Sequence, residues 1–377
     1  MFTPTTQDEV REAVLALPAV RVRGGGAKPA LSAGATLSTA GLRGILEYEP
    51  GEFTFTALAG TPLAEVRDAL AANGQYLPFD PPWAAAGATL GGTVAAGLSG
   101  PGRFQYGGVR DFLLGVRIVT GDGRAVRGGD KVVKNAAGFD IPKLMVGSLG
   151  RLGVITEVSF KVFPAPAATA TVVVEFRRLE DATAMLQRLA ASRLALAALE
   201  LEPGRAAPRR AGDVSPPLDQ PARLLLRLGG LRDALPARIT RVREFLGSGP
   251  GIELIDDDEL FWQSAAEFNW APVDHALAKM PLVSSQIADL ESALAGAASE
   301  VPRRYSVGGN AAWLAWPSSV ESILLHTAAE RLGRKLLVVR NPDPSASLTV
   351  EHNPLLLKLL SVFDPQRKFA KADLNPA

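Results

Sequence analysis

Cysteine is absent from the 377-residue sequence, and only three histidines occur, His275, His326 and His352. Without cysteine, the chain has no disulfide, no cysteine-ligated zinc, no iron–sulfur cluster of its own and no thiol nucleophile. A metal site built from several histidines would need all three to converge, so we predict no metal site. An excess of one charge is also lacking, because 40 basic and 39 acidic residues leave a net charge of +1. This balance does not indicate nucleic-acid binding.

Long apolar segments are missing as well. No run reaches the roughly 18 apolar residues needed to cross a bilayer, and the first ten residues lack the hydrophobic core of a signal peptide. We therefore expect a cytoplasmic protein, with attachment to the inner face of the cell membrane through partners as an alternative. Hydrophobic residues make up 47 % of the chain, which suffices for the cores of two or three domains.

Glycine is distributed unevenly, since 26 of the 37 glycines fall within residues 1–164. Glycine permits positive φ angles and close backbone approach, so this part is predicted to contain tight turns or backbone wrapped around a ligand. The stretch Pro164–Ala170 (PAPAATA) is typical of a hinge. We therefore predict three regions, residues 1–165, 171–345 and 346–377.

The second region alternates strand and helix patterns. The order strand, helix, strand, strand, helix, strand is that of a ferredoxin-like α+β unit. Its predicted strands are residues 171–176, 196–201, 223–228 and 252–255, its predicted helices are 179–191 and 231–246, and Pro203–Pro221 is a predicted loop. A further segment has predicted strands near 277–283, 303–307 and 335–340 and a helix near 320–332.

The tail is predicted to form one helix. Asn353 is a suitable N-cap, Pro354 suits the first helical position, and Asp364-Pro365 ends the pattern. Residues 355–363 carry seven large apolar side chains. A surface tail is the alternative, but this apolar content predicts that the tail packs on another domain.

Four glycine-bearing segments carry the strongest functional signal. The first, Arg23–Lys28, has three consecutive glycines whose N–H groups can converge into a nest for an anion such as pyrophosphate. The others are Ala88–Gly100, Tyr106–Gly108 and Gly147–Glu157. A turn without ligand is the alternative for each segment alone, whereas one extended ligand held by backbone amides explains all four.

Two common phosphate motifs do not account for these glycines. The Walker pattern does not occur in the sequence. A dinucleotide-binding Rossmann fingerprint would open a helix after the last glycine, but Ala27–Leu31 predicts a turn instead. An NAD-type Rossmann domain is therefore disfavoured.

The order of the motifs resembles the FAD-binding domain of the vanillyl-alcohol oxidase / p-cresol methylhydroxylase (PCMH) superfamily. The matching segments are the nest at 23–28, a strand at 53–60, a helix at 62–73, a turn at 77–81, residues 89–100, 106–107 and 111, a strand at 114–120 with a hairpin at 121–123, and residues 134–140 and 147–157. The resemblance implies a PCMH-type two-subdomain FAD-binding domain, then a ferredoxin-like α+β cap domain, with the C-terminal helix returning to the FAD-binding domain.

The resemblance also implies which residues bind FAD. Members with covalent flavin often carry Gly-His-Ser in the nest, where this chain has Gly26-Ala27-Lys28, so noncovalent FAD is expected. The implied FAD-binding residues are Arg23, Gly24, Gly25, Gly26, Ala27, Lys28, Pro78, Asp80, Thr89, Gly91, Gly92, Thr93, Gly100, Tyr106, Gly107, Ser148, Gly150, Gly153 and Ile155.

Within the superfamily, the chain resembles the FAD-binding subunits of bacterial glycolate oxidases. The likeness rests on Lys131–Asp140, on Tyr305–Leu314, and on a chain shorter than the catalytic 2-hydroxyacid dehydrogenase subunit. It implies oxidation of glycolate, or of the close analogue D-lactate, to the 2-oxo acid. It also implies two partners, an FAD-containing 2-hydroxyacid dehydrogenase subunit and an iron–sulfur subunit that receives the electrons.

Two alternatives stay open, a non-catalytic accessory subunit and a stand-alone FAD-dependent 2-hydroxyacid dehydrogenase. The stand-alone enzymes carry the motif His-x-Gly-Asp-Gly-Asn-x-His near a metal. The equivalent region here, Ser306–Ala312, contains no histidine. This difference argues against a stand-alone enzyme.

Oxidising a 2-hydroxy acid also needs a cation for the carboxylate and a base for the hydroxyl proton. Arg303 and Arg304 are candidates for the first role, with a solvated pair at a strand end as the alternative. His275 is a candidate base, with a structural or exposed histidine as the alternative. The triplet Asp256–Asp258 is predicted to be a helix N-terminus rather than a metal cluster. Four tryptophans could line a flavin or belong to a core, namely Trp262, Trp270, Trp313 and Trp316.

Overall fold

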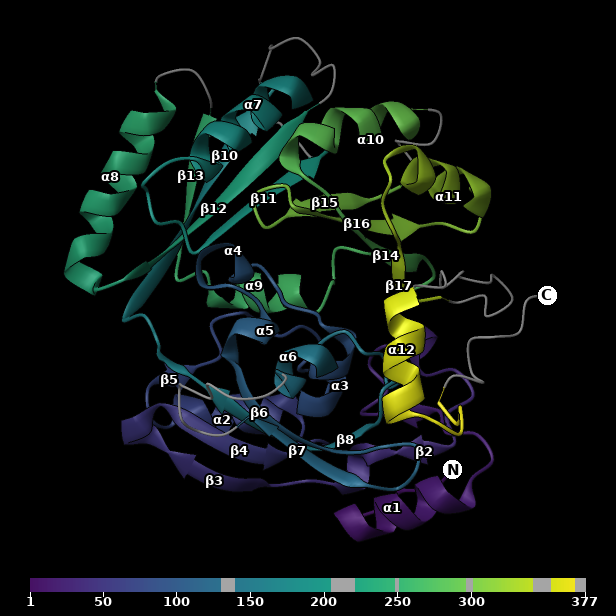
Figure 1. Cartoon of the computed structure of the whole chain (residues 1–377). Coiled ribbons are helices and arrows are strands. Elements are labelled where there is room, and N and C mark those ends of the chain that lie inside the picture. The colour runs from purple at the N-terminus through teal and green to yellow at the C-terminus, as the bar shows by residue number, and fades with distance from the viewer. Residues whose placement is uncertain (130–139, 205–220, 248–250, 296–300, 342–353, 370–377) are drawn as a thin grey trace. The chain divides into compact units, whose positions relative to one another are not determined.

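The computed structural model describes residues 1–129, 140–204, 221–247, 251–295, 301–341 and 354–369 (Figure 1). The chain forms two compact units. The N-terminal unit comprises residues 1–100, 107–165 and 347–377, and the C-terminal unit comprises residues 101–106 and 166–346. Both units mix helices and sheets. No helix among the described residues has the length and apolar character that a membrane crossing requires.

The N-terminal unit is built on a five-stranded antiparallel sheet in the order β3-β4-β8-β6-β7. The predicted strands at 53–60 and 114–120, and the hairpin between β6 and β7, are confirmed. Its strands are β3 (Ile45–Glu49), β4 (Thr54–Leu58), β6 (Leu113–Val119), β7 (Ala125–Gly129) and β8 (Val154–Lys161).

Phenylalanine rings fill the core next to this sheet. Phe160 of β8 stacks on Phe55 of β4 with 5.8 Å between ring centroids, and on Phe79 at 6.1 Å. Phe79 also packs against Phe112, at 5.5 Å. All four rings are at most 1 % exposed, so this cluster holds the sheet to the segments that follow β4 in sequence.

Short elements surround the sheet. The helix predicted at 62–73 is confirmed as α2 (Leu63–Ala71). A short strand, β1 (Val22–Arg23), leads into the glycine nest and pairs in parallel with β2 (Leu37–Ser38). The other elements are α1 (Gln7–Ala16), β5 (Gln75–Tyr76), α3 (Leu90–Ala96), α5 (Val109–Phe112), α6 (Ile141–Met145) and β9 (Phe163–Pro164).

The chain's last helix and the residues after it fold onto the N-terminal unit. The helix predicted at 355–363 is confirmed as α12 (Pro354–Phe363), ending before Asp364 as expected, while its predicted N-cap lies outside the described residues. The carbonyl oxygen of Phe363 accepts from the N–H of Gly121, at 2.8 Å. Lys368 donates from Nζ to two carbonyl oxygens at the end of α1, at 2.6 and 2.9 Å. Phe369 is buried in a cluster with α1 side chains.

The C-terminal unit contains an eight-stranded antiparallel sheet in the order β13-β10-β12-β11-β15-β16-β14-β17. Its first four strands and two helices have the predicted ferredoxin-like order and confirm that prediction. These elements are β10 (Ala168–Phe176), α7 (Leu179–Ala190), β11 (Ala198–Pro203), β12 (Ala222–Gly230), α8 (Leu235–Leu246) and β13 (Gly251–Asp256).

The remaining strands repeat the same order. The repeat is joined to the first half where β11 meets β15, at Leu201 opposite Tyr305. Sequence analysis missed this repeat because β16 falls in a segment that we interpreted as a glycine motif. Its elements are β14 (Ala276–Pro281), α10 (Ile287–Ala293), β15 (Arg303–Ser306), β16 (Ala311–Trp316), α11 (Ser322–Arg331) and β17 (Leu337–Arg340).

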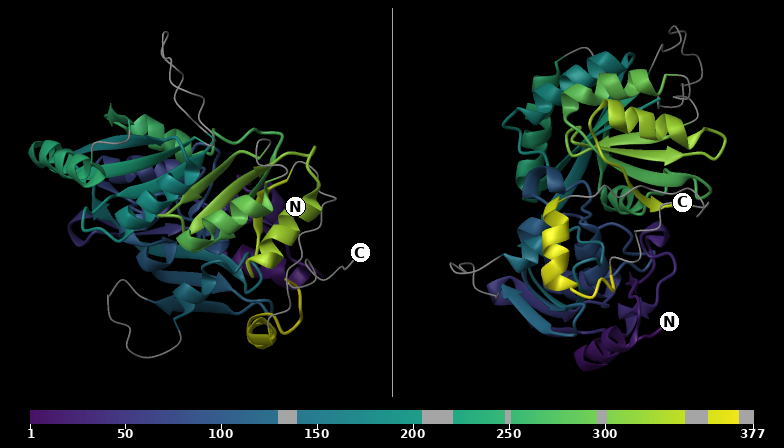
Figure 2. Two further views of the ribbon diagram at one scale, coloured as in Figure 1. Left: turned by 90° about the horizontal axis from the view of Figure 1, so that it is seen from above. Right: turned by 45° about the vertical axis from the view of Figure 1, so that its right-hand side comes forward.

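The two faces of this sheet differ. Helices α7, α8, α10 and α11 cover one face, as the view from above in Figure 2 shows. The short helix α9 (Glu259–Ala266) lies on the other face. There Trp262 packs on Val173, Ala198 and Leu225, whose side chains alternate with the residues that face the four helices. Polar side chains of β11 and β15 lie on the α9 face, as described below.

Candidate functional site

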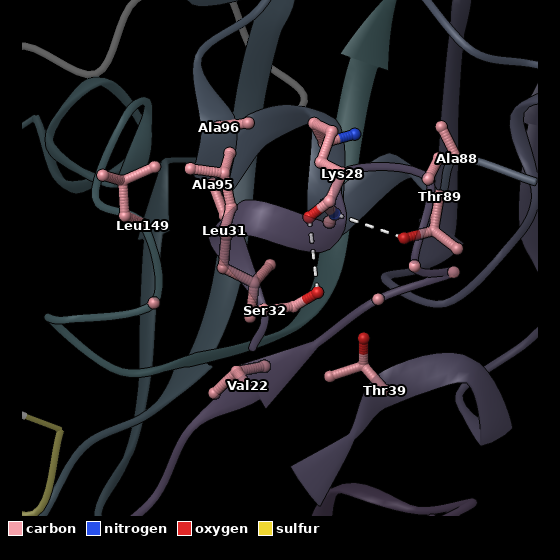
Figure 3. Close-up of a pocket in the computed structure, with 18 of the residues that line it drawn as sticks. Val22, Lys28, Leu31, Ser32, Thr39, Ala88, Thr89, Ala95, Ala96 and Leu149 are labelled. Carbon is pink, nitrogen blue, oxygen red and sulfur yellow. Dashed lines mark hydrogen bonds between the residues drawn. The ribbon is translucent and has the colours of Figure 1, made fainter. Parts of the chain in front are cut away.

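A pocket in the N-terminal unit lies among three of the four glycine-bearing segments. It encloses about 660 Å³ of space, part of which is open solvent. One wall is the nest at 24–28, a second is the segment 88–96 that contains α3, and a third is the loop 149–155 (Figure 3). The fold therefore brings together segments that are more than a hundred residues apart in sequence.

The nest and the α3 segment approach so closely that only glycine fits between them. A Cβ on Gly25 would overlap the carbonyl oxygen of Gly87. Gly26 has φ +84°, in the left-handed region that favours glycine. Thr89 is the N-cap of α3, and its hydroxyl accepts from the N–H of Gly92 at 3.3 Å. The glycines thus bring backbone, rather than side chains, to the wall of the pocket.

Lys28 is the one charged side chain among the residues lining this pocket. The residue is buried, and its Nζ lies 5.4 Å from the centroid of the Trp83 ring. Burial lowers the pKa of Lys28 to about 8. No acidic side chain lines the described pocket. A buried ammonium without a carboxylate is costly, so the pocket suits an anionic group of a ligand.

Eleven of the nineteen residues that the resemblance implied for FAD line the pocket. They come from all three walls, and they are Gly24, Gly25, Gly26, Ala27, Lys28, Thr89, Gly91, Gly92, Gly150, Gly153 and Ile155. Eight do not line it, namely Arg23, Pro78, Asp80, Thr93, Gly100, Tyr106, Gly107 and Ser148.

Two of these eight carry an independent sign of a missing partner. The hydroxyl oxygens of Thr93 and Ser148 are buried and have no hydrogen-bond partner in the described part of the chain. Buried hydroxyls are normally satisfied. The glycine cradle and Lys28 fit a ligand with an anionic group.

Other members of the eight have structural neighbours. The guanidinium of Arg23 lies beside Gly26, where a Cβ would touch it. Gly100 lies against Asp80, which itself has φ +46°. Gly107 lies against Asp111, whose carboxylate accepts from the N–H of Gly108 at 2.8 Å. These contacts shape the turns that support the pocket.

Sequence reasoning missed eight lining residues. Most are small or apolar and carry no chemical signal of their own, although all but Thr39 lie within five residues of a glycine segment that we singled out. They are Val22, Leu31, Ser32, Thr39, Ala88, Ala95, Ala96 and Leu149. Adjacency to the glycine segments was the only signal that could have found them.

In the C-terminal unit, Arg303 and Arg304 are both engaged by carboxylates. Arg303 makes two bonds to Glu291, Nε to Oε1 at 2.6 Å and Nη2 to Oε2 at 2.5 Å. Arg304 pairs with Glu202 and lies 3.7 Å from Glu200. Their side chains are 9 % and 7 % exposed, so the alternative of a solvated pair is wrong. Both arginines are therefore already bound to carboxylates of the chain and are not free to bind the carboxylate of a substrate.

Glu200 completes this buried cluster on β11. Its Oε2 accepts from the Ser306 hydroxyl at 3.0 Å, while its Oε1 has no partner in the described residues. Burial raises the pKa of Glu200 to about 7, against the opposing effect of the Arg304 charge. The cluster joins β11 and β15, the two strands where the halves of the sheet meet.

The two described histidines, His275 and His326, contact different partners. His275 lies next to Asp274, with 3.1 Å between Nδ1 and Oδ1, and its carbonyl oxygen accepts from Arg340. His326 contacts the Ser322 carbonyl within α11, at 2.9 Å. His352 lies outside the described residues. The described residues contain no group of three or more histidine, aspartate or glutamate side chains that could hold a metal ion.

The aspartate triplet and the tryptophans belong to the body of the C-terminal unit. Asp258 is the N-cap of α9, as the helix interpretation requires, but its buried carboxylate accepts from Thr171 and pairs with Arg227. Trp262, Trp313 and Trp316 are 4 to 5 % exposed, and Trp270 is half-buried. The Trp262 indole donates to Thr171 at 2.8 Å.

Comparison with known proteins agrees with this geometry. Residues 1–129 match the family model described as an FAD binding domain. Over 171 residues the chain is 44 % identical to glycolate oxidase subunit GlcE of Escherichia coli K12, covering 45 % of this chain and 49 % of that protein. It is 31 % identical over 175 residues to D-lactate dehydrogenase of Anaerostipes hadrus, covering 46 % of this chain and 36 % of that protein. It is 30 % identical over 156 residues to glycolate oxidase subunit GlcD of Bacillus subtilis, covering 41 % of this chain and 33 % of that protein. The matches thus span about half the length of these relatives or less.

The whole fold also has a solved counterpart. A structure of alkyldihydroxyacetonephosphate synthase superimposes with a TM-score of 0.68 at 17 % identity, covering 97 % of this chain and 76 % of that one. This likeness concerns the fold alone. The family match, the motif order and the glycine-lined pocket agree that residues 1–129 are similar to an FAD binding domain.

Proposed function

We propose that the chain is the FAD-binding subunit of a heteromeric glycolate oxidase. In this role it oxidises glycolate, or the close analogue D-lactate, to the 2-oxo acid. The observation that carries the proposal is the pocket in which a glycine nest meets the buried Lys28, both within residues 1–129, which match the FAD binding domain model. The similarity to subunit GlcE supports glycolate as the substrate.

In this proposal the nest and Lys28 hold the cofactor's pyrophosphate. Consecutive N–H groups around Gly24–Gly26 favour an anion, and the ammonium of Lys28 adds a positive charge that lacks an acidic neighbour in the pocket. Arg23, beside Gly26, adds a second cation. Thr93 and Ser148 supply hydroxyls for further polar atoms of the ligand. The cofactor is held noncovalently, because alanine and lysine occupy positions 27 and 28.

The reaction removes two electrons and two protons from the carbon and the hydroxyl of the hydroxy acid. Bound FAD supplies the electron acceptor, and the protein supplies orientation and charge. The chain lacks cysteine and so cannot ligate an iron–sulfur cluster through thiolates. We therefore place the cluster that receives the electrons on an iron–sulfur partner, beside a second FAD-containing 2-hydroxyacid dehydrogenase subunit. Any attachment to the inner face of the membrane is made through these partners.

A second candidate function is a non-catalytic accessory subunit of the same complex. The observation in its favour is that the predicted catalytic arginines are engaged by glutamates and that His275 contacts Asp274. In this case the pocket would hold a flavin for electron transfer or for structure only.

The first test is the absorption spectrum of the purified chain after incubation with FAD, before and after acid precipitation. Flavin bands that pass into the supernatant support noncovalent FAD. Flavin that stays with the precipitate means a covalent link, and no flavin at all overturns the cofactor proposal. Because the proposed partner also carries FAD, the catalytic subunit is distinguished from the accessory one by loss of glycolate oxidation in a complex whose copy of this chain cannot bind FAD. A complex that retains full activity when this chain cannot bind FAD favours the accessory function.

A further inference from the structure

A tryptophan in an unusual backbone conformation lies beside Lys28 in the N-terminal unit. Trp83 is buried and has φ +64°, in the left-handed region. A bulky side chain is rare there, because its Cβ crowds the following carbonyl oxygen. Such conformations persist only where the surrounding structure enforces them, and they cluster at ligand sites. The conformation of Trp83 therefore draws attention to what its ring contacts.

The ring of Trp83 contacts a cation. The Nζ of Lys28 lies 5.4 Å from the ring centroid, within the roughly 6 Å over which an indole face attracts an ammonium. No carboxylate of the described pocket lining accompanies this ammonium, and burial alone accounts for the lowered pKa of Lys28. An indole carries no net charge, whereas a carboxylate would cancel the charge of the lysine. The ring thus stabilises the ammonium and leaves its charge for a ligand.

The loop that carries Trp83 also contacts the glycine nest. The carbonyl oxygen of Trp83 accepts from the N–H of Ala88 at 2.9 Å, which closes the loop between them. Within this loop, the carbonyl oxygen of Gly87 occupies the space that a Cβ on Gly25 would need. One loop therefore contacts the nest at two points, through the ring at Lys28 and through backbone at Gly25. It supports both the ammonium and the backbone N–H groups of the same pocket wall.

We propose that Trp83 is a positioning residue for the cofactor, whose ring holds the Lys28 ammonium in the pocket wall where it meets the pyrophosphate. The inference rests on the proposed function for the identity of the ligand. Trp83 is not among the residues that line the pocket, so it acts through Lys28 rather than by contact with the ligand. It is the fifth tryptophan of the chain, and sequence analysis did not single it out.

The test is a double-mutant cycle on the affinity of the isolated chain for FAD, measured by fluorescence titration. Trp83→Leu keeps an apolar side chain and a Cβ but removes the ring. We expect it to raise the Kd for FAD by roughly 10-fold, within the range of a desolvated cation–π contact. In a Lys28→Met background the same substitution should change the Kd by less than roughly twofold, because the charge that the ring positions is gone. A ring that only fills space would weaken binding equally in both backgrounds.

Two further variants sharpen the cycle. Trp83→Phe retains a ring that attracts a cation more weakly, and its Kd should rise by roughly two- to fivefold. Trp313→Phe is the matched control, because the Nζ of Lys279 lies 5.7 Å from the centroid of that ring in the C-terminal unit, and neither residue lines the described pocket. It should leave the Kd unchanged. The thermal unfolding temperature without ligand reports whether each variant is folded.

Inorganic pyrophosphate tests the ammonium without the flavin. It is titrated into the isolated chain, and the rise in unfolding temperature is recorded. Pyrophosphate should stabilise the wild-type chain and Trp313→Phe to the same extent. It should stabilise Trp83→Leu and Lys28→Met less, because the first misplaces the ammonium and the second removes it.

The outcomes separate this inference from the proposed function. A folded Trp83→Leu chain that binds FAD and pyrophosphate as wild type does overturns the inference, and so does a loss that is equal with and without Lys28. FAD binding by the wild type upholds the proposed cofactor in both cases. A wild-type chain that is stabilised by pyrophosphate but binds no FAD overturns the proposed cofactor, and dependence of that stabilisation on Trp83 then still supports the inference. Absence of both ligands' binding to the wild type overturns both proposals. If Trp83→Leu does not fold, Trp83→Phe in the two backgrounds decides the question.

Discussion

The N-terminal pocket and the α9 face of the C-terminal sheet each place a lysine against a tryptophan, but they surround it differently. Lys28 lies among glycines and small apolar residues, with no acidic side chain in the described pocket lining. Lys279 of β14 lies opposite Trp313 of β16, which in turn lies opposite Arg304 of β15. The arginines there, Arg304 and Arg223, are paired with Glu202. Binding in the first region is thus distributed over backbone groups. In the second region the described glutamates pair with arginines and not with Lys279.

This difference separates structural charges from binding charges. Arg303 and Arg304 attracted attention in the sequence because arginine suits a carboxylate. In the folded chain both are paired with glutamates. Lys28 was among the residues that the resemblance implied for FAD, and Lys279 had no sequence signal, yet neither bonds to a carboxylate of the described residues. The following predictions test whether paired cations serve stability and unpaired ones serve ligands.

The largest effect is expected from Gly25→Ala. Even a methyl group there would overlap the Gly87 carbonyl oxygen, so the nest must open. We expect FAD binding to fall below detection in a fluorescence titration. The matched control is Gly51→Ala, also in the N-terminal unit, where a Cβ meets no atom within 4 Å. Normal FAD affinity in Gly25→Ala would show that the nest does not hold the cofactor.

The next effect tests a paired cation. Arg304→Met leaves Glu202 and Glu200 buried without that charge, and removing one partner of a buried ion pair costs about 3–5 kcal/mol. We expect the free energy of unfolding, measured in urea, to fall by that amount. Lys279→Met should change it far less, because no carboxylate loses a partner. A larger loss of unfolding free energy in Lys279→Met than in Arg304→Met would show that the paired arginine is not the more important cation for stability.

Lys28→Met tests the unpaired cation of the first region. Loss of a charged hydrogen bond to the cofactor, about 1.5–3 kcal/mol, should weaken FAD affinity by roughly 10- to 100-fold without reducing the stability of the free chain. Wild-type affinity should fall as the pH rises above the Lys28 pKa of about 8, because the ammonium loses its proton. The affinity of Lys28→Met should not change over that range. A wild-type affinity that is constant from pH 7 to 9 would place the lysine away from the anion.

The smallest effect concerns Glu200. Its pKa is raised to about 7, so the folded chain favours the protonated form, and stability falls as the pH rises from the ordinary value of 4.5 through 7. Glu200→Gln removes the cost of ionising a buried carboxyl group as the pH rises. The variant should match wild type near pH 4 and exceed it by on the order of 1–2 kcal/mol at pH 8. This gain is less than the full pKa shift implies, because glutamine also loses the attraction of Arg304. Equal stabilities at pH 8 would show that Glu200 is not buried as a neutral acid.

Local patterns predicted much of the fold. Thr171–Phe176 and Arg223–Leu228 are β-branched or leucine-rich and lie within β10 and β12. The leucine and alanine spacing of 179–191 matches α7. The second ferredoxin-like half was not predicted, because β16 reads AAWLAW and directly follows Gly308-Gly309. A short strand inside a glycine context has no periodicity long enough to distinguish it from a loop.

For the site, glycine placement was the informative signal and side-chain charge was the misleading one. Gly24–Gly26 and Gly91-Gly92 could be predicted because close backbone approach demands glycine, whatever the distance along the chain. The apolar walls at Leu31 and Leu149 could not, since such residues are equally common in any core. Arginine at 303 or 304 is compatible with substrate binding or with a buried ion pair, and only its neighbours distinguish the two.

The sequence by itself determined the order of motifs, the absence of thiol chemistry, the glycine-dependent nest and the alternation of strands and helices, because each depends on residue type and short-range spacing. The tertiary structure decided which charges are neutralised. Glu202 lies 102 residues from Arg304, and Glu291 lies 12 from Arg303. Whether such groups meet depends on strand register and burial, which arise only when the sheet is assembled. The same assembly leaves Lys28 without an acidic side chain in the described pocket lining, which favours an anion there.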